Sequence, residues 1–360
     1  MPRIFLIDGN SQMYRAYHAI RGLTGPDGKS TNAIYGFVNM LRKLIADHHP
    51  DYIVASFDLP GRTFRDDLAA DYKANRTPMP SDLAEQVAVV HAACEAMGVP
   101  NLTVENFEAD DVLGTLAVKA HAAGFDVAIV TGDKDFYQLV TDGLRVFNPK
   151  DEGTWFDAEA VLTKFGVRPE QVVDVLSLMG DAIDNIKGVP GIGEKGAREL
   201  IGAHGTLEAL LAAAPSLPQK RHREALLQFA AEARASRVLA TIRTDVPIEF
   251  EAESLRYRGP DAPRCYEMFM RLGFRTFTAE YAPTAATSAH DYSIVESPEE
   301  LDPLAAQIRE AGHVSIGVVA TAHADLESSL VGLSLATQAG AARYIPLGHI
   351  GLTETPNLRT

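Results

Sequence analysis

The stretch that decides the fold is VAIVTGDKD at residues 127–135. Its first four residues are apolar and mostly β-branched, which predicts a short buried strand. The strand breaks at Thr131 and Gly132, and Asp133 and Asp135 follow at once. Two carboxylates at the end of a buried strand are costly unless a cation lies between them. This stretch therefore predicts both a strand and a cation site.

Two other strand-like runs end in the same way. RIFLI at 3–7 runs into Asp8, and YIVASF at 52–57 runs into Asp58. Helical spacing at 32–49, between the two runs, indicates βαβ units and a parallel sheet. Ligands of open parallel sheets bind beyond the carboxyl ends of the strands. We therefore expect an α/β fold with one acidic cleft at that edge.

Two more acidic groups lie further along the chain. EADD at 108–111 opens a predicted helix directly before the central strand, and GDAIDN at 180–185 follows another helix. Acids in a first helical turn suit the helix dipole, which accounts for one or two of these carboxylates but not for three. The predicted metal ligands are Asp8, Asp58, Glu108, Asp110, Asp111, Asp133, Asp135, Asp181 and Asp184.

So many carboxylates in one cleft would repel one another without cations. Ligation by oxygen alone, with no His or Cys, selects a hard ion such as Mg²⁺, with Mn²⁺ as a substitute. The number of acids exceeds one such site and predicts two or more ions. Two ions roughly 4 Å apart suit in-line displacement at a phosphodiester. The residues thus predict metal-dependent hydrolysis of phosphate esters.

Composition alone argues against a nucleic-acid ligand, because the 360-residue chain has a net charge of −15. Local clusters indicate the opposite. Residues 61–80 are polar, rich in Arg and Lys, and weakly apolar, which suits either a phosphate-binding surface or a merely solvated one. The run GVPGIGEKG at 188–196 contains GxGxxG but follows a helix rather than a strand, so we reject a dinucleotide site. It predicts a helix–hairpin–helix turn, whose N–H groups approach a phosphate beside Lys195 and Arg198.

The remaining features indicate an ordinary intracellular protein. Cys94 and Cys265 lie far apart, without metal-type spacing, and predict a reducing compartment. No secretion signal and no apolar run of membrane-spanning length is visible, so a cytoplasmic location is expected.

The motifs together resemble a known family. Six motifs are similar to those of the 5′-nuclease domains of bacterial DNA polymerases I. They are LIDGN at 6–10, SFD at 56–58, YKANR at 72–76, FEADD at 107–111, TGDKD at 131–135 and GDAIDNIKGVPGIGEK at 180–195. The wider family includes the flap endonucleases. The match covers about residues 3–281.

This resemblance implies a PIN-like α/β core with a helical arch and a helix–three-turn–helix element. It implies a 5′→3′ exonuclease or 5′-flap endonuclease of replication and repair that acts on flaps, nicks and RNA primers. The expected domains are a nuclease at 1–281 (core about 1–175, DNA-binding part about 176–281), a linker at 282–291 and an incomplete domain at 292–360. A monomer, associated with the nucleoid through DNA, is expected.

The resemblance also implies roles for single residues. A first metal site would be formed or supported by Asp8, Asp58, Glu108, Asp110 and Asp111. The other four acids would form a second metal site. Lys73 and Arg76 would steer the scissile phosphate, and Arg15 matches a basic position near the cleft. The implied DNA-binding residues, with a K⁺ at the hairpin, are Tyr72, Lys187, Gly188, Gly191, Gly193, Lys195 and Arg198.

The tail resembles the start of a proofreading-type exonuclease domain of RNase H-like fold. Active versions carry Asp-x-Glu on the strand where this chain has Gly317 and Val319, so we expect no 3′→5′ exonuclease activity. No polymerase domain is visible, and we expect the chain to be part of a longer polymerase.

Three alternatives remain. A non-catalytic DNA-binding scaffold would gain nothing from nine buried acids. A phosphatase with a nucleophilic Asp would need a second Asp where Asn10 stands. A small PIN-type ribonuclease would not need residues 180–281.

Overall fold

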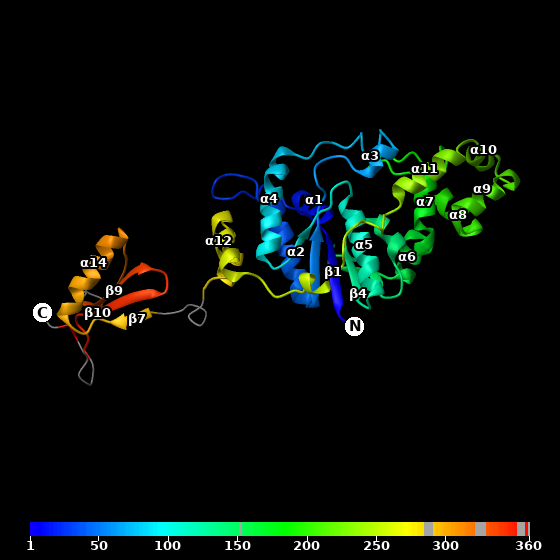
Figure 1. Cartoon of the computed structure of the whole chain (residues 1–360). Helices are drawn as coiled ribbons and strands as arrows, with labels where there is room; N and C mark the ends of the chain where they lie inside the picture. The colour runs from blue at the N-terminus through cyan, green and yellow to red at the C-terminus, as the bar shows by residue number, and fades with distance from the viewer. Residues whose placement is uncertain (151–152, 284–290, 321–328, 351–356, 359–360) are drawn as a thin grey trace. The chain divides into compact units, whose positions relative to one another are not determined.

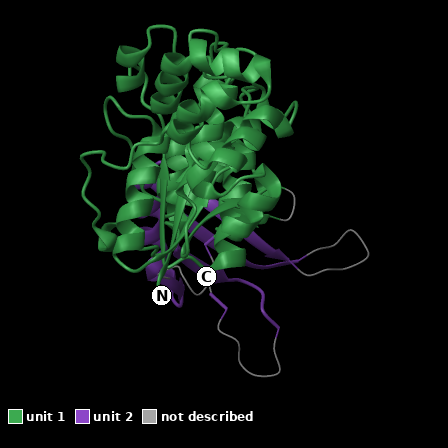
Figure 2. Cartoon of the chain, turned by 90° about the vertical axis from the view of Figure 1, so that its right-hand side faces the viewer, with its two compact units in different colours: residues 1–282 green, residues 283–360 purple. Residues whose placement is uncertain are grey.

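The computed structural model describes all residues except 151–152, 284–290, 321–328, 351–356 and 359–360. The chain divides into two compact units, residues 1–282 and 283–360, coloured separately in Figure 2. Residues 284–290 of the predicted linker lie outside the described residues. The finer division of the first unit into a core and a DNA-binding part stays a prediction.

A single sheet organises the first unit, and its strand order is β3-β2-β1-β4-β5-β6. Neighbouring strands are parallel except for β5 and β6, which are antiparallel. The predicted strands at 3–7, 52–57 and 127–130 are confirmed. The strands are β1 (Arg3–Asp8), β2 (Tyr52–Ser56), β3 (Asn101–Leu102), β4 (Asp126–Val130), β5 (Leu144–Asn148) and β6 (Thr154–Phe156).

Helices cover both faces of this sheet (Figure 1). Alternate residues of β1 enter different cores: Phe5 and Ile7 pack with one group of helices, and Ile4 and Leu6 with the other. The first group is α1 (Gly9–Ala19), α2 (Asn32–His48), α4 (Ser81–Ala96), α12 (Ala262–Leu272) and α13 (Arg275–Glu280). Burial on both faces explains why the strands read as continuous apolar runs.

The second face carries α5 (Ala109–Ala122) and the helices that follow the sheet. These are α6 (Ala158–Phe165), α7 (Val172–Met179), α8 (Glu194–His204), α9 (Leu207–Ala213), α10 (Lys220–Gln228) and α11 (Ala230–Ala240). Short 3-10 turns occur at η1 (Lys134–Leu139), η2 (Pro169–Gln171), η3 (Ala214–Ser216) and η4 (Ala252–Leu255). The predicted hairpin lies between α7 and α8.

The segment between β2 and α4 contains the basic run at residues 61–80. It contains one short helix, α3 (Phe64–Leu68), and an irregular stretch up to Pro80. Arg65 and Tyr72 in this segment are buried, with 3% and 6% exposure. The expectation of a purely superficial segment was therefore wrong at these two positions, because each side chain finds polar partners inside the protein.

The second unit contains its own sheet in the order β7-β10-β9-β8, with one helix packed on it. Its elements are β7 (Asp291–Ile294), η5 (Pro298–Glu300), α14 (Leu301–Ala311), β8 (Ser315–Ala320), β9 (Leu330–Gln338) and β10 (Ala341–Pro346). Gly317 on β8 faces Ser334 so closely that a Cβ there would lie 2.2 Å from its Oγ. An acidic side chain would not fit at this position without rearrangement.

Among the described residues, no helix has the length and apolar character that crossing a membrane requires.

Candidate active site

Three strands and one helix start deliver carboxylates to the same end of the sheet. Asp8 ends β1, Asp58 follows β2, and Asp133 follows β4. Glu108 caps α5, whose first turn carries Asp110. The Asp58 carboxylate accepts a hydrogen bond of 2.7 Å from the N–H of Ala109, which ties β2 to the start of α5. The predicted meeting of acids at the carboxyl edge is thus observed.

Asp8 is the most deeply placed of the strand-end acids, with 4% exposure. Its carboxylate accepts hydrogen bonds from the Thr131 hydroxyl at 2.6 Å and from the Ser11 N–H at 2.9 Å. Burial nevertheless raises the pKa of Asp8 to about 7, and the charges of Asp133 and Asp58 add to the rise. Thr131, predicted only as a strand break, is thus a partner of the site.

Asp110 lies where several carboxylates act on it together. Burial, followed by the charges of Asp8, Asp133, Asp58 and Glu108, raises its pKa well above the ordinary value. Asp8, Asp58 and Glu108 were, like Asp110, assigned to the first metal site, and their charges act on Asp110 here. Asp133, whose charge also acts on Asp110, was assigned to the second.

The second group of acids surrounds the turn after β4. The pKa of Asp135 is raised by burial and by the charges of Asp133, Asp181 and Asp184. The pKa of Asp133 is also raised by burial, and the charges of Asp184 and Asp181 add to the rise. Asp181 accepts hydrogen bonds from the N–H groups of Ile183 and Asp184, which shapes the loop after α7. Asp133 therefore belongs to both groups.

Two basic side chains neutralise part of this charge. Lys73 Nζ lies 2.5 Å from Glu108 Oε1 and 3.9 Å from Asp184 Oδ2. Arg76 donates to Asp184 Oδ1 at 2.5 and 3.2 Å. Both predicted phosphate-steering residues thus lie at the carboxylates, Lys73 between the two groups and Arg76 at Asp184 of the second.

The YKANR segment is held against the loop after α7 through its backbone as well. Lys73 has a left-handed backbone (φ 54°), and its N–H donates to the Asp184 carbonyl at 3.0 Å. Asn75 donates to the Ala182 carbonyl at 2.6 Å, and Asn185 to the Asp71 carbonyl at 2.5 Å. The two motifs, separated by about a hundred residues, form one structural unit.

Tyr72 was expected to contact DNA, and the structure gives it a different place. Its ring belongs to the hydrophobic core, and its hydroxyl lies 3.2 Å from Glu108 Oε2 and 3.3 Å from Asp184 Oδ2. A ring with 6% exposure cannot stack on a base in this conformation. Its place in a basic run agreed with a DNA contact, but its hydroxyl points inward to Glu108 and Asp184.

Asp111 also differs from its neighbours. It is fully buried, and Arg65 donates to its two oxygens at 2.6 and 2.8 Å. The N–H groups of Arg243 and Glu108 donate to it at 2.8 and 3.2 Å. With both oxygens occupied, Asp111 supports the site through Arg65 and does not present a free oxygen to a metal.

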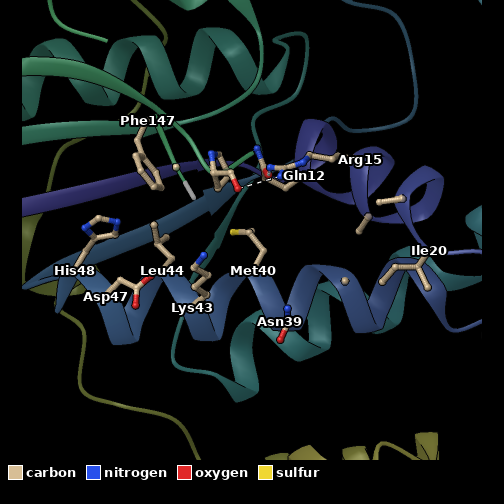
Figure 3. Close-up of a pocket in the computed structure, with 15 residues that line it drawn as sticks. Gln12, Arg15, Ile20, Asn39, Met40, Lys43, Leu44, Asp47, His48 and Phe147 are labelled. Carbon is tan, nitrogen blue, oxygen red and sulfur yellow. Dashed lines mark hydrogen bonds between the residues drawn. The ribbon is translucent and has the colours of Figure 1, made fainter. Parts of the chain in front are cut away.

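Arg15 lies on α1 and lines a pocket of about 310 Å³ between α1, α2 and Phe147 (Figure 3). Its guanidinium donates to the Pro149 carbonyl at 3.0 Å and to Gln12 Oε1 at 3.4 Å.

Tyr14, one residue earlier, was not predicted as a site residue. The pKa of Tyr14 is raised by burial, and the charges of Arg76 and Asp58 also act on it, so this ring lies close to the acidic cleft.

The hairpin between α7 and α8 contains two kinds of glycine. Gly188 is buried and has φ 62°, and its N–H donates to Ser236 Oγ at 3.1 Å. This N–H is therefore engaged inside the protein, and a DNA contact at Gly188 stays a prediction. Gly191 and Gly193 are exposed, and Gly193 caps α8 with open space where a side chain would begin.

The basic residues of the hairpin differ in their pairing. Lys195 is 91% exposed and lies 4.0 Å from Glu199. Arg198 pairs with Glu194 at 2.5 Å and packs over the Phe165 ring, and Lys187 pairs with Asp71 at 2.9 Å. Lys195 is the residue of these three with the weakest intramolecular contact.

The donor set fits divalent metal ions, although the ligands are not gathered into a finished shell. No group of three or more His, Cys, Asp or Glu side chains within the described ranges is arranged to hold an ion as it stands. Asp135 Oδ1, however, is buried and has no hydrogen-bond partner in the part of the chain that the structure describes. A buried carboxylate oxygen without a partner, among acids that repel one another, is a ligand suited to a hard cation.

Comparison with known proteins agrees with this geometry. Residues 3–166 match the N-terminal resolvase-like domain of 5′-3′ exonucleases, and residues 167–263 match their C-terminal SAM-fold domain. Over residues 3–263, the chain belongs to the 5′-3′ exonuclease family.

Curated relatives of this exonuclease-family chain include DNA polymerase I of Pseudomonas aeruginosa, 38% identical over 96% of the chain, and thermostable DNA polymerase I of Thermus aquaticus, 37% identical over 83%. The chain covers 40% and 34% of these two proteins. It thus spans less than half the length of the polymerases that it matches.

Solved structures show the same fold. The T5 5′-exonuclease, solved with divalent metal ions, has a TM-score of 0.57 at 22% identity and covers 78% of this chain and 98% of its own. The catalytic core of Rad2 in complex with DNA has a TM-score of 0.53 at 16% identity, over 78% of this chain and 91% of its own. The predicted PIN-like nuclease fold is confirmed.

Proposed function

We propose that this chain is a metal-dependent 5′ nuclease that hydrolyses phosphodiester bonds in DNA with 5′ flaps, nicks or RNA primers. The observation that carries the proposal is the convergence of Asp8, Asp110, Asp133 and Asp135 at one sheet edge, where burial and mutual repulsion raise every one of their pKa values. Such a site is costly to maintain unless cations bind to it. The homologous DNA polymerases I support the choice of DNA as substrate.

The proposed ions are Mg²⁺, with Mn²⁺ as a substitute, because every available ligand is a carboxylate. Asp8, Asp58, Glu108 and Asp110 would hold one ion, and Asp135, Asp181 and Asp184 the other, with Asp133 between them. Bound there, the ions would activate water and neutralise charge on the reacting phosphate. We further propose a K⁺ at the hairpin, as this family implies, a monomeric state and a cytoplasmic, nucleoid-associated location.

The protein's own residues would bind and orient the substrate. Lys73 and Arg76, now paired with Glu108 and Asp184, carry positive charge at the cleft and would bind the scissile phosphate. Lys195 and the exposed N–H groups near Gly191 and Gly193 would hold the duplex backbone. The buried hydroxyl of Tyr72 would orient Glu108 and Asp184.

Cleavage of a labelled 5′-flap duplex tests the proposal. We expect release of the flap in Mg²⁺ and none in EDTA, with duplex binding in both conditions. Asp133→Ala and Asp135→Ala should abolish cleavage and retain binding, because these changes remove metal ligands and leave the hairpin intact. A protein that binds the flap substrate but does not cut it in Mg²⁺ or Mn²⁺ would be a DNA-binding scaffold, and the proposal would be wrong.

For the second unit, we propose that it lacks 3′→5′ exonuclease activity, since Gly317 and Val319 provide no metal ligand. Metal-dependent trimming of a 3′ end by the Asp133→Ala variant would contradict this proposal.

A further inference from the structure

The end of α11 and the short segment after it contact both acid-bearing elements of the site. We call these residues, 239–246, the strap. It lies against α5 so closely that a Cβ at Gly114 would be 2.6 Å from Ile242 Cγ2. Its apolar residues Ile242 and Val246 are buried, with 6% and 1% exposure. The strap is therefore a fixed part of the core on this side of the sheet.

Arg65 joins the strap to the start of α5. Its Nε donates to the Leu239 carbonyl at 3.0 Å, and its Nη2 donates to the Thr241 carbonyl at 2.9 Å. The same guanidinium binds Asp111 through two hydrogen bonds and reaches Glu108 Oε2 at 3.3 Å. One planar group thus fixes the position of Glu108 relative to the strap.

Gln138 makes the equivalent connection to the turn after β4. Its Nε2 donates to the Asp135 carbonyl at 2.9 Å and to the Ala240 carbonyl at 3.1 Å. Its Oε1 accepts from the Ile242 N–H at 3.0 Å. All these bonds involve backbone atoms, so the side chain sets the distance between the strap and the Asp133–Asp135 turn.

Further hydrogen bonds extend the attachment in both directions. Thr115 on α5 accepts from the Val246 N–H at 3.1 Å and donates to the Arg243 carbonyl at 3.4 Å. On α11, one turn before the strap, Ser236 accepts from the Gly188 N–H of the hairpin. The hairpin, the strap and the two acid-bearing elements are therefore connected through α11.

We propose that Arg65 and Gln138 are positioning residues, which use the strap to hold Glu108 and the Asp133–Asp135 turn at the separation that metal binding requires. Neither side chain would ligate a metal or touch the substrate. The inference rests on the proposed function of the carboxylates. It assigns to α11 and the strap a role in preorganising the site, beyond packing.

Metal binding without DNA provides the decisive measurement. We would titrate Mg²⁺ by calorimetry into the wild type, Gln138→Met, Arg65→Lys and Arg65→Met, and measure the Mg²⁺ midpoint for flap cleavage in parallel. Losses of supporting hydrogen bonds around ligands weaken metal binding about 10- to 100-fold. We expect a shift in this range for Gln138→Met and Arg65→Met, and a smaller one for Arg65→Lys, which keeps the charge but loses the bidentate geometry.

Arg237→Met is the matched control. Arg237 also lies on α11 and pairs with the buried Asp174 at 2.6 Å, so its loss destabilises the same helix without breaking a strap contact. We expect reduced thermal stability and an unchanged Mg²⁺ midpoint. DNA affinity in Ca²⁺ should stay within about twofold of wild type for Gln138→Met, because the hairpin is unaltered.

The possible outcomes separate the two proposals. If the wild type binds Mg²⁺ and cuts flaps, but Gln138→Met and Arg65→Lys keep its Mg²⁺ midpoint, the positioning role is wrong and the nuclease assignment stands. A shift of equal size in Arg237→Met would show a general effect of destabilisation and would also overturn the inference. If Arg65→Met does not fold, the other two variants decide. A wild type that neither binds Mg²⁺ nor cuts contradicts the proposed function itself.

Discussion

Arg65 donates to both oxygens of Asp111, at 2.6 and 2.8 Å, and neither side chain is more than 3% exposed. Asp110, the next residue, carries a carboxylate whose pKa is raised by burial and by its acidic neighbours. Two adjacent acids on one helical turn therefore have opposite electrostatic surroundings. Asp111 is paired with a buried cation, whereas Asp110 is surrounded by other acids.

This contrast predicts opposite effects of the same substitution at adjacent positions. Without metal at pH 8, Asp111→Asn should lower the free energy of unfolding by about 3 kcal/mol, because it leaves the buried Arg65 with only its longer contact to Glu108 as a charged partner. Asp110→Asn should raise it by about 1 kcal/mol, because it removes a repelled charge. Denaturant unfolding in EDTA measures both. Two changes of the same sign would contradict the different surroundings described for Asp110 and Asp111.

The pH dependence of stability follows from Asp8. Burial raises its pKa from 3.8 to about 7 in the folded protein. Between these values, folded Asp8 keeps a proton that the unfolded chain has lost, so its contribution to the free energy of unfolding falls as pH rises from about 4 to about 7. Asp8→Asn removes this contribution.

In EDTA, we therefore expect Asp8→Asn to become more stable than the wild type as pH rises from about 4 to about 7. The measured quantity is the free energy of unfolding of the variant minus that of the wild type. It should reach on the order of 2–4 kcal/mol and level off above pH 8. Saturating Mg²⁺ should reverse the difference, because only the wild type keeps the ligand. A difference that is constant from pH 4 to 8 would show that Asp8 titrates normally.

The sequence predicted the sheet and the meeting of the acids for a clear physical reason. Strands buried on both faces read as apolar runs, and the strand-end acids stand at or shortly after such runs, as Asp8 and Asp133 do. Arg65 and Tyr72 were misread because their burial depends on long-range partners. Arg65 is buried against carbonyls some 175 residues further along the chain, and no local sequence pattern indicates this contact.

The hairpin illustrates the same limit at single glycines. Its GxGxxG spacing correctly predicted a tight turn before a helix, and it does not distinguish a glycine that packs from one that faces solvent. At Gly188, a Cβ would lie 2.4 Å from the backbone nitrogen of Gly180, whereas Gly193 has open space around it. The distinction depends on the C-terminal end of α7, which only the folded chain brings against Gly188.

Alanine at these two glycines should therefore have very different effects. Gly188→Ala combines φ 62° with a clash against backbone, and we expect it to lower the free energy of unfolding by about 3 kcal/mol or more. Gly193 has an extended backbone and open space for a Cβ, so Gly193→Ala should change the free energy of unfolding by less than about 1 kcal/mol. Thermal unfolding of both variants checks this. Equal losses would mean that the hairpin is packed differently from the structure described.

Lys195 provides a test of the hairpin as a duplex-binding surface. Its ammonium is 91% exposed and has only a 4.0 Å contact with Glu199, so it is available to a DNA phosphate. Lys195→Ala should weaken duplex binding and reduce the slope of log affinity against log salt by about one unit. Fluorescence anisotropy in Ca²⁺ at several salt concentrations measures both quantities.

Arg3→Ala serves as the control for this measurement. Arg3 begins β1, at the end of the strand away from the carboxylates, and its guanidinium pairs with Asp126 at 2.7 Å. Removing it deletes one positive charge, as Lys195→Ala does, without changing the hairpin. The salt slope of Arg3→Ala should equal that of the wild type. If both variants change the slope equally, the effect reflects net charge, and the duplex does not bind at the hairpin.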